Sequence, residues 1–247
     1  TRGKMNRSSN PLEEAFVLAA GLGLRMRPIT ETMPKPLVPV AGDTMLDHAL
    51  NALERSGVSK AVVNVHYLAD QIEQHIAQRE YPGIIISDER AELLDSGGGI
   101  KKGIEHFSQD GMFILNSDSF WIEGARPNLV RMRDMWNPET MDMLLLLAPM
   151  TQAVGFDGRG DFFMDSEGLL TRRGEAETAP FVYSGAIAAR TDLFRQVKEK
   201  KFSLNRLFDE AIEKDRLYGI RLEGLWLHVG TPEAIGEAED AIARQAA

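Results

Sequence analysis

Cysteine is absent from the 247 residues of the chain. Its absence excludes disulfide bonds, thiolate metal sites and cysteine nucleophiles, and it is typical of proteins from a reducing cytoplasm. Long apolar runs are also missing, because the longest, at 143–150, has only the length of a strand. The chain has no basic block, and its formal net charge is −9. We therefore predict a cytoplasmic protein that has neither a membrane nor a nucleic acid as its partner.

The start of the chain differs in composition from the rest. Residues 1–13 are polar and mixed in charge, and they lack the apolar segment of a secretory signal. No linker rich in proline or serine interrupts the sequence that follows. We interpret residues 1–13 as a flexible leader and residues 14–247 as a single domain, long enough to bury a sizeable core.

Short apolar runs alternate with amphipathic segments along most of the chain. We predict strands at 15–20, 61–65, 84–87, 112–115 and 143–149. Helices are predicted at 44–56, 69–79, 100–107 and 232–246. This alternation is typical of βαβ units and predicts a Rossmann-like, doubly wound α/β fold. Longer strands at 162–173, 181–190 and 218–229 would add a small antiparallel extension, which makes the sheet mixed.

A glycine-rich turn, GLGLRMRP at 21–28, follows the first predicted strand. It is not a dinucleotide-binding fingerprint, because Met26 takes the place of the third glycine, and no Gly-Lys-Ser/Thr follows as in a Walker A loop. Gly21 and Gly23 would let backbone N–H groups approach an anion beside Arg25. Lys35 stands between two prolines that fix the local chain. We interpret these residues as a triphosphate cradle, and a plain strand–turn with surface cations is the alternative.

Two further segments follow predicted elements at the edge where doubly wound sheets bind ligands. Asp118 comes after the strand at 112–115, and opposite the cationic turn it would suit Mg²⁺, which binds carboxylates together with substrate phosphates. An aspartate that caps a turn is the alternative. The segment SGGG at 96–99 precedes a predicted helix, where its backbone would approach a flat base or an anion. An ordinary helix junction is the alternative there.

Six motifs follow one another between residues 15 and 239: GLGLRMRP, PKPLVPVAG, SGGG, LNSDS, YSGAIAA and WLHVGTPE. Their order resembles the sugar-1-phosphate nucleotidyltransferases, and LLDSGGGI, GRGDF and YSG are most similar to the N-acetylmuramate-1-phosphate uridylyltransferases of peptidoglycan recycling. The resemblance implies that a sugar 1-phosphate and an NTP give an NDP-sugar and pyrophosphate. It further implies UTP and N-acetylmuramate 1-phosphate as substrates, with a mannose-1-phosphate guanylyltransferase or another sugar-1-phosphate transferase as the alternative.

The resemblance also assigns roles to residues. The catalytic residues would be Arg25 on the β- and γ-phosphates, Lys35 between the α-phosphate and the sugar phosphate, and Asp118 on Mg²⁺. The nucleotide-binding residues would be Ala20, Gly21, Gly23, Arg25, Gly97 and Gly98, the last two beside the base. The sugar-binding candidates are Asp161, Tyr183, Ser184, Gly185 and Asn205. Residues 14–150 would bind the nucleotide and 151–247 the sugar, in one domain that acts on small molecules as a monomer or weak homodimer.

One motif departs from the family pattern at the second metal position. The family usually has Asp-x-Gly-Thr there, whereas this chain has His228 followed by Val-Gly-Thr. Imidazole suits transition metals better than Mg²⁺. Three outcomes are open. Asp118 and the phosphates hold Mg²⁺ with help from a carboxylate such as Asp161, His228 makes the site prefer Mn²⁺ or Co²⁺, or the metal site is impaired.

A non-catalytic sensor of nucleotides or sugar nucleotides on the same fold is the rival from another functional class. Such a sensor would keep the glycine-rich turn but would not need both Arg25 and Lys35, so the enzyme is favoured. N-acetylmuramate carries a lactyl carboxylate, which calls for a cation near the sugar. Arg159 and Arg172 are candidates for that cation, and ordinary surface positions are the alternative for both.

Overall fold

The computed structural model describes residues 12–247, so the predicted leader lies outside the described residues except for Leu12 and Glu13. Its α-helices are α1 (Met45–Arg55), α2 (Ala69–Ile76), α3 (Asp95–Gly103), α4 (Asn128–Met135), α5 (Asp192–Gln196), α6 (Leu204–Glu213) and α7 (Pro232–Gln245). Its strands are β1 (Glu14–Leu18), β2 (Pro39–Val40), β3 (Asp43–Thr44), β4 (Lys60–Val65), β5 (Gly83–Asp88), β6 (Gly111–Asn116), β7 (Ser119–Glu123), β8 (Met143–Pro149), β9 (Ala153–Val154), β10 (Phe162–Met164), β11 (Leu170–Arg172), β12 (Phe181–Arg190), β13 (Leu217–Arg221) and β14 (Gly224–His228).

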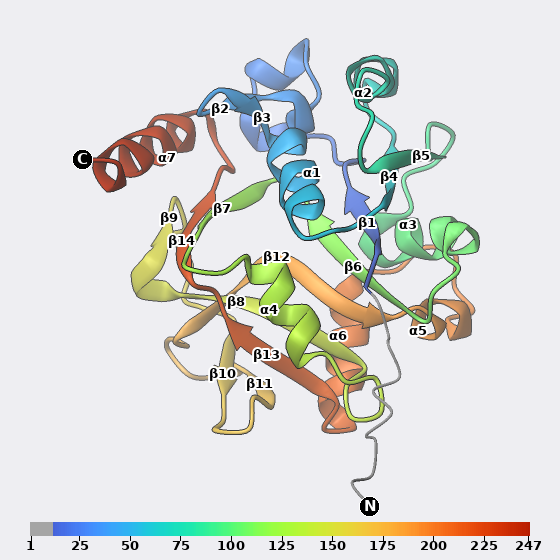
Figure 1. Ribbon diagram of the computed structural model, residues 1–247, viewed down its shortest axis with the longest axis vertical. Helices are drawn as coiled ribbons and strands as arrows, with labels where there is room; N and C mark the ends of the chain where they lie inside the picture. The colour runs from blue at the N-terminus through green and yellow to red at the C-terminus, as the bar shows by residue number, and fades with distance from the viewer. Residues whose placement is uncertain (1–11) are drawn as a thin grey trace, which may run out of the picture.

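A nine-stranded sheet runs through the centre of the molecule (Figure 1). Its strands follow the order β11-β10-β12-β6-β1-β4-β5, and β8 and β13 continue it on the other side of β12. Strands β6, β1, β4 and β5 are parallel to one another. Strand β12 runs antiparallel to β6 and β8. The sheet is therefore mixed, and the predicted α/β fold class is confirmed.

Helices cover both faces of this sheet. Consecutive side chains of a strand point to opposite faces, and those at the centre of β1 are fully buried on both. Ala15 and Val17 belong to one core cluster with residues of α1, α2 and α4. Phe16 belongs to another with residues of α3, α5 and α6. Burial on both faces explains why the parallel strands are continuous apolar runs in the sequence.

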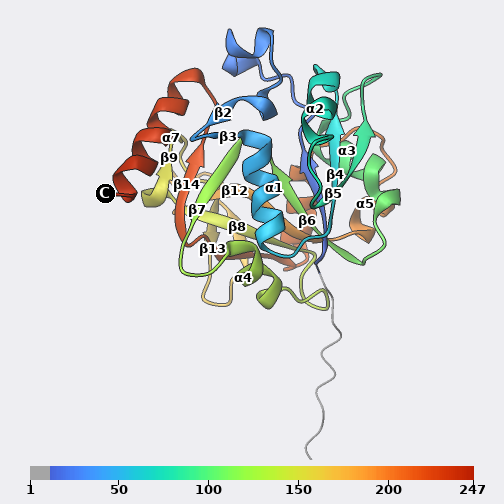
Figure 2. The same ribbon diagram turned by 45° about the horizontal axis from the view of Figure 1, so that its top comes forward.

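A second, smaller sheet is formed by β7, β14 and β9, and α7 packs against it (Figure 2). Ala234 and Ala238 of α7 share a core cluster with Leu227 of β14 and with Val229. Met26 of the glycine-rich turn belongs to the same cluster. Packing of the C-terminal part of the chain thus fixes the turn that follows β1.

Several predicted elements are confirmed, among them the helix at 44–56, which is α1, and the strand at 143–149, which is β8. Three predictions were wrong in detail. The helix predicted at 100–107 already begins at Asp95, so the glycines at 97–99 lie inside α3. The strand predicted at 162–173 is a hairpin of β10 and β11. The strand predicted at 218–229 is divided between β13, which is parallel to β8, and β14 of the smaller sheet.

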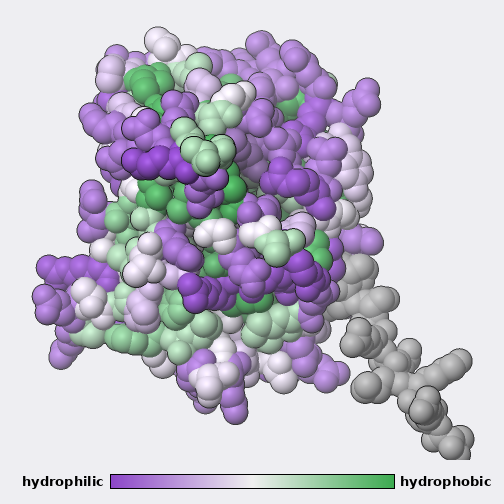
Figure 3. Space-filling view, turned by 60° about the vertical axis from the view of Figure 1, so that its left-hand side comes forward, coloured by the Kyte–Doolittle hydropathy of each residue, from purple (hydrophilic) through white to green (hydrophobic). Residues whose placement is uncertain are grey.

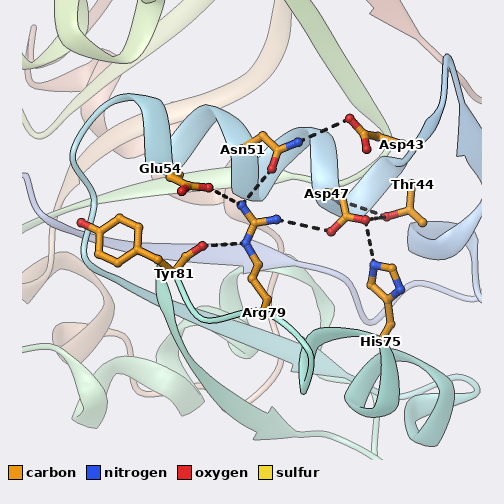
Figure 4. A network of polar contacts seen from close by, with 8 residues as sticks. All are labelled: Asp43, Thr44, Asp47, Asn51, Glu54, His75, Arg79 and Tyr81. Atoms are coloured by element: carbon orange, nitrogen blue, oxygen red, sulfur yellow. Dashed lines mark hydrogen bonds and ion pairs between the residues drawn. The ribbon is translucent and has the colours of Figure 1, made fainter.

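A polar network connects α1 with the segment around α2 (Figure 4). The Arg79 guanidinium donates to Asn51 Oδ1 at 2.8 Å and to Glu54 Oε2 at 2.9 Å. His75 Nε2 lies 2.8 Å from Asp47 Oδ2. These contacts hold two helices of the same sheet face together, some distance in sequence from the glycine-rich turn.

The face drawn in Figure 3 carries hydrophilic residues over most of its area, with hydrophobic residues between them. Within residues 12–247, no helix is both long enough and apolar enough to cross a membrane.

Candidate active site

A cavity of about 540 Å³ lies where β1, β4 and β6 end. Its walls are the turn after β1, the segment that leads into α3, and the residues that follow β6. The sequence-predicted residues that line it are Ala20, Gly21, Gly23, Arg25, Lys35 and Asp118. The fold therefore brings the predicted phosphate cradle and the predicted metal ligand into one cavity.

The glycine-rich turn packs tightly on its inner side. Gly23 has a φ of +65°, in the left-handed region that favours glycine. A Cβ at this position would lie 3.0 Å from Thr30 Cγ2 and 3.1 Å from Lys35 Cβ. The Thr30 hydroxyl donates a hydrogen bond to the Gly23 carbonyl at 2.6 Å. Gly21 is exposed, and a Cβ added there would have no neighbour within 4 Å, so the backbone is open to a ligand.

Opposite charges face each other in the cavity. Lys35 Nζ lies 4.0 Å from Asp118 Oδ2, and the Lys35 side chain is only 14% exposed. Burial lowers the pKa of Lys35, the Asp118 carboxylate raises it, and the Arg25 guanidinium lowers it. Arg25 and Lys35 both line the cavity, so the two cations share one site. Two cations and one carboxylate thus surround a space that suits a polyphosphate.

Gly97 and Gly98 lie in the first half of α3 and do not line the cavity. Both backbone N–H groups donate to the Phe202 carbonyl, at 3.0 and 3.1 Å. A Cβ on Gly97 would lie 2.3 Å from the Phe202 ring, and one on Gly98 would lie 2.4 Å from the Lys200 carbonyl. The structure thus gives these glycines a packing role against residues 200–202. Ser96 and Asp95, which precede them, do line the cavity.

Sequence reasoning missed Asn64, at the end of β4, as a residue of this site. Asn64 is only 2% exposed, yet it lines the cavity. Its Oδ1 accepts a hydrogen bond from Ala19 N at 2.7 Å. The available signal was Asn64 itself, the one polar residue within the apolar run AVVNV at 61–65. A buried amide needs hydrogen-bond partners, so a polar residue inside an apolar strand indicates such contacts.

Tyr183, Ser184 and Gly185 lie at an irregularity of β12, where the register with β8 shifts. Ser184 is fully buried, and its hydroxyl donates to the Leu146 carbonyl at 2.6 Å. The Tyr183 hydroxyl is buried and has no hydrogen-bond partner among residues 12–247. Burial raises the pKa of Tyr183, and the Asp118 charge raises it further. Of this trio, Tyr183 therefore carries the polar group that lacks a partner among the described residues.

Asp161 and Asn205 occupy different surroundings. Asp161 Oδ2 accepts a hydrogen bond from Tyr183 N at 2.8 Å, which connects it to the irregular part of β12. Asn205 lies on α6 and its Oδ1 accepts from Arg172 at 3.2 Å. Arg172 also forms an ion pair with Asp209 at 2.9 Å. Neither Asp161 nor Asn205 lines the cavity described above.

Arg159 lies in a segment that runs between two other predicted residues. At one end of the segment, the Gly155 carbonyl is 3.2 Å from His228 Nδ1. At the other end, Asp161 is bonded to Tyr183. Arg159 is exposed and forms no ion pair within the described part of the chain, in contrast to Arg172.

His228 ends β14 next to Asp118, because Val229 N donates to the Asp118 carbonyl at 3.1 Å. The Gly155 carbonyl can only accept, so Nδ1 is the donor in this contact, and in the neutral ring Nε2 would then have the free lone pair. The ring centroid lies 5.6 Å from that of Trp226 and 6.1 Å from that of Phe156. His228 is therefore held by aromatic packing, and Nε2 is the only ring atom left for a metal.

The carboxylate of Asp118, 36% exposed, fits a metal ion that is shared with a nucleotide. Mg²⁺ commonly takes one or two carboxylates and completes its coordination with phosphates and water. Within residues 12–247, no three histidine, cysteine, aspartate or glutamate side chains are grouped to hold a metal. The site thus suits a cation that arrives with phosphate ligands.

Comparisons with known proteins show what the chain is similar to. A profile of the MobA-like NTP transferase domain matches residues 15–132. The chain is 42% identical over 233 residues to N-acetylmuramate alpha-1-phosphate uridylyltransferase of Caulobacter vibrioides, covering 93% of this chain and 96% of the relative. It is 27% identical over 229 residues to mannose-1-phosphate guanylyltransferase catalytic subunit beta of Danio rerio, covering 89% and 62%. The crystal structure of HddC from Yersinia pseudotuberculosis, complexed with GMP-PN, has a TM-score of 0.71 at 18% identity, covering 93% and 99%, and shows the same fold.

Proposed function

We propose that this chain, which belongs to the sugar-1-phosphate nucleotidyltransferase family, transfers UMP from UTP to N-acetylmuramate 1-phosphate. The observation that carries the proposal is the 42% identity to a uridylyltransferase of that specificity over nearly the whole chain. The cavity lined by Arg25, Lys35 and Asp118 supports it. The products would be UDP-N-acetylmuramate and pyrophosphate, which fits the reuse of a cell-wall sugar.

The reaction would be an in-line displacement at the α-phosphorus of UTP. An oxygen of the sugar phosphate forms the new P–O bond while the bond to the β-phosphate oxygen breaks. Such a transfer depends on positioning and on neutralisation of charge. Lys35, buried beside Asp118, would lie between the α-phosphate and the sugar phosphate. Arg25, exposed at the rim, would bind the β- and γ-phosphates and stabilise the leaving pyrophosphate.

A divalent cation, Mg²⁺ in the first place, would accompany the nucleotide. When bound, it supplies positive charge to the phosphates and orients them. Asp118 would hold it together with the phosphates, and Nε2 of His228 would be an additional ligand for Mn²⁺ or Co²⁺. Because nucleoside triphosphates are cytoplasmic metabolites, the reaction would take place in the cytoplasm.

The sugar would lie on the side of Asp118 that faces β12 and β14. The Tyr183 hydroxyl, buried and without a partner among the described residues, is a ready donor to a sugar or phosphate oxygen. Arg159 is our candidate for the lactyl carboxylate, because Arg172 is already paired with Asp209. Arg159 also lies between the segments that contact His228 and Tyr183.

The experiment that tests the proposal is pyrophosphate release over a grid of substrates. UTP, GTP, dTTP and CTP are each combined with the 1-phosphates of N-acetylmuramate, N-acetylglucosamine, glucose and mannose, in Mg²⁺ and in Mn²⁺. Turnover with UTP and N-acetylmuramate 1-phosphate is expected. Turnover with GTP and mannose 1-phosphate instead would assign the activity of the more distant relative. No turnover in either metal, with nucleotide still bound by calorimetry, would identify a sensor.

A further inference from the structure

A buried carboxylate that the reaction does not use lies behind the nucleotide cavity. Glu89 follows β5 and is only 1% exposed. Its Oε2 accepts from Asn64 Nδ2 at 2.6 Å, and its Oε1 accepts from Leu94 N at 3.1 Å. Both donors are neutral, and no lysine, arginine or histidine forms an ion pair with Glu89 within residues 12–247. Because burial of an unpaired carboxylate is costly, these two hydrogen bonds must be well formed.

The contact with Glu89 fixes the orientation of the Asn64 amide. The amide nitrogen points to Glu89, so the amide oxygen points the other way and accepts from Ala19 N at 2.7 Å. Ala19 is the first residue after β1 and lines the cavity beside Ala20 and Gly21. If the Asn64 amide were rotated by half a turn, its NH₂ group would face the Ala19 N–H, and two donors would meet without an acceptor. Glu89 therefore determines, through Asn64, where the glycine-rich turn begins.

The second oxygen of Glu89 holds the opposite wall of the cavity. Leu94 N, which donates to it, lies between Leu93 and Asp95, and both of these residues line the cavity. Helix α3 packs directly on the pair, since a Cβ on Gly99 would lie 2.8 Å from Asn64 Nδ2 and 2.8 Å from Glu89 Oε2. There is thus no room for a side chain beside this contact. One carboxylate connects the phosphate wall with the wall that precedes α3.

We propose that Glu89 is a positioning residue for the nucleotide: through Asn64 and Leu94 it holds the two walls of the cavity at the separation that binds the triphosphate and its base. The inference rests on the proposed function only in that a nucleoside triphosphate enters this cavity. It does not depend on which sugar phosphate is the acceptor.

The donor and acceptor pattern allows a direct test by exchange. Glu89→Gln has one acceptor oxygen where two are needed, so an N–H of the new amide must face Asn64 Nδ2 or Leu94 N. Asn64→Asp places two carboxylates in contact. The double variant Glu89→Gln/Asn64→Asp restores every bond. Its glutamine amide donates to the new aspartate and accepts from Leu94 N, while the aspartate also accepts from Ala19 N. The double variant keeps the net charge of the wild type as well.

Each single variant should lower kcat/KM for the nucleotide and raise its Kd by about 10- to 100-fold, the range for one unsatisfied buried group. The KM of the sugar phosphate should change much less. The double variant should return to within about 3-fold of the wild type. Glu92→Gln is the matched control, because Glu92 is an exposed carboxylate of the same turn that pairs with Lys200, and it should behave as the wild type.

Nucleotide Kd by calorimetry and unfolding temperature are measured on all of these proteins. Single variants that unfold at lower temperature but bind nucleotide with the wild-type Kd would overturn the proposal, because Glu89 would then be structural only. A double variant no better than the worse single variant would overturn it as well. Wild-type protein that binds nucleotide and yet turns over no sugar phosphate would refute the proposed function. The nucleotide Kd values of the variants would still test the role of Glu89 in that case.

Discussion

The proposed nucleotide side and the proposed sugar side of the site are built in different ways. The nucleotide cavity has walls of consecutive residues, from the turn after β1, from the start of α3 and from the end of β6. The sugar side gathers Asp161, Tyr183 and His228 from three separate segments. Most of its polar groups already have partners, since Ser184 bonds to Leu146 and Asp161 to Tyr183. Each wall of the first side is thus a run of neighbouring residues, whereas the second side consists of single residues from separate segments.

From this difference we expect the first side to carry the reaction and the second side to determine sugar specificity. A phosphate cradle of adjacent glycines and cations serves any nucleotide and any phosphate acceptor. Two groups on this side have no side-chain partner among the described residues, the buried Tyr183 hydroxyl and the exposed Arg159 guanidinium, and we expect these two to distinguish one sugar from another. Substitutions in the cavity should therefore affect all substrates alike, whereas those on the sugar side should affect one substrate more than the others.

The largest effect is expected from loss of a cavity charge. Lys35→Ala and Arg25→Ala should each reduce kcat/KM by at least about 100-fold with every acceptor, because an aimed charge on the transferring phosphates is lost. Asp118→Asn should abolish metal-dependent turnover. Steady-state pyrophosphate release with two different sugar phosphates measures this. A loss of kcat/KM with only one of the two sugar phosphates would contradict the division of the site into a nucleotide side and a sugar side.

A smaller and selective effect is expected from Arg159→Ala. Its kcat/KM should fall by about 10- to 50-fold for N-acetylmuramate 1-phosphate, the range for one charge-assisted hydrogen bond, and little for N-acetylglucosamine 1-phosphate, which lacks the carboxylate. Arg172→Ala is the matched control, because Arg172 is paired with Asp209 and should not discriminate between the two sugars. Equal losses on both substrates would remove Arg159 from sugar recognition.

His228→Asp should change the metal preference by only a few fold. An added carboxylate beside Asp118 favours the hard ion Mg²⁺, so the ratio of the rates in Mg²⁺ and Mn²⁺ should rise by about 3- to 10-fold. Rates titrated with each metal give the ratio. If it is unchanged, His228 does not take part in metal binding.

The smallest effect concerns pH. Burial and Arg25 lower the pKa of Lys35 below its usual value, with Asp118 opposing them, so the free enzyme loses this proton at a lower pH than an exposed lysine does. Since the charged form binds phosphate, kcat/KM should fall as the pH rises through that pKa. Asp118→Asn removes the opposing carboxylate and should move the nucleotide-binding limb to lower pH, measured as Kd against pH. A shift to higher pH would contradict the assigned contacts.

Much of the fold was predictable because strands that are buried on both faces are apolar runs in the sequence, as β8 is with all seven residues buried. The start of α3 was predicted too late because three consecutive glycines are typical of a loop. They belong to the helix because neighbours such as the Phe202 ring leave no room for larger side chains, and the sequence does not show those neighbours. The prediction of one strand at 218–229 was wrong because the chain passes from the large sheet to the smaller one at Gly224, whose φ is +111°. Glu89 escaped notice because its partners Asn64 and Leu94 come from separate elements.

The most direct test of the central claim is a competition in one reaction. Equal amounts of the four nucleoside triphosphates and of the 1-phosphates of N-acetylmuramate, N-acetylglucosamine, glucose and mannose are incubated with the enzyme, and the products are identified by mass spectrometry. We expect UDP-N-acetylmuramate as the dominant product. With Arg159→Ala, the product should remain a UDP-sugar while the preference among sugars weakens. A dominant GDP-sugar, or no nucleotide sugar at all, would contradict the proposed uridylyltransferase activity.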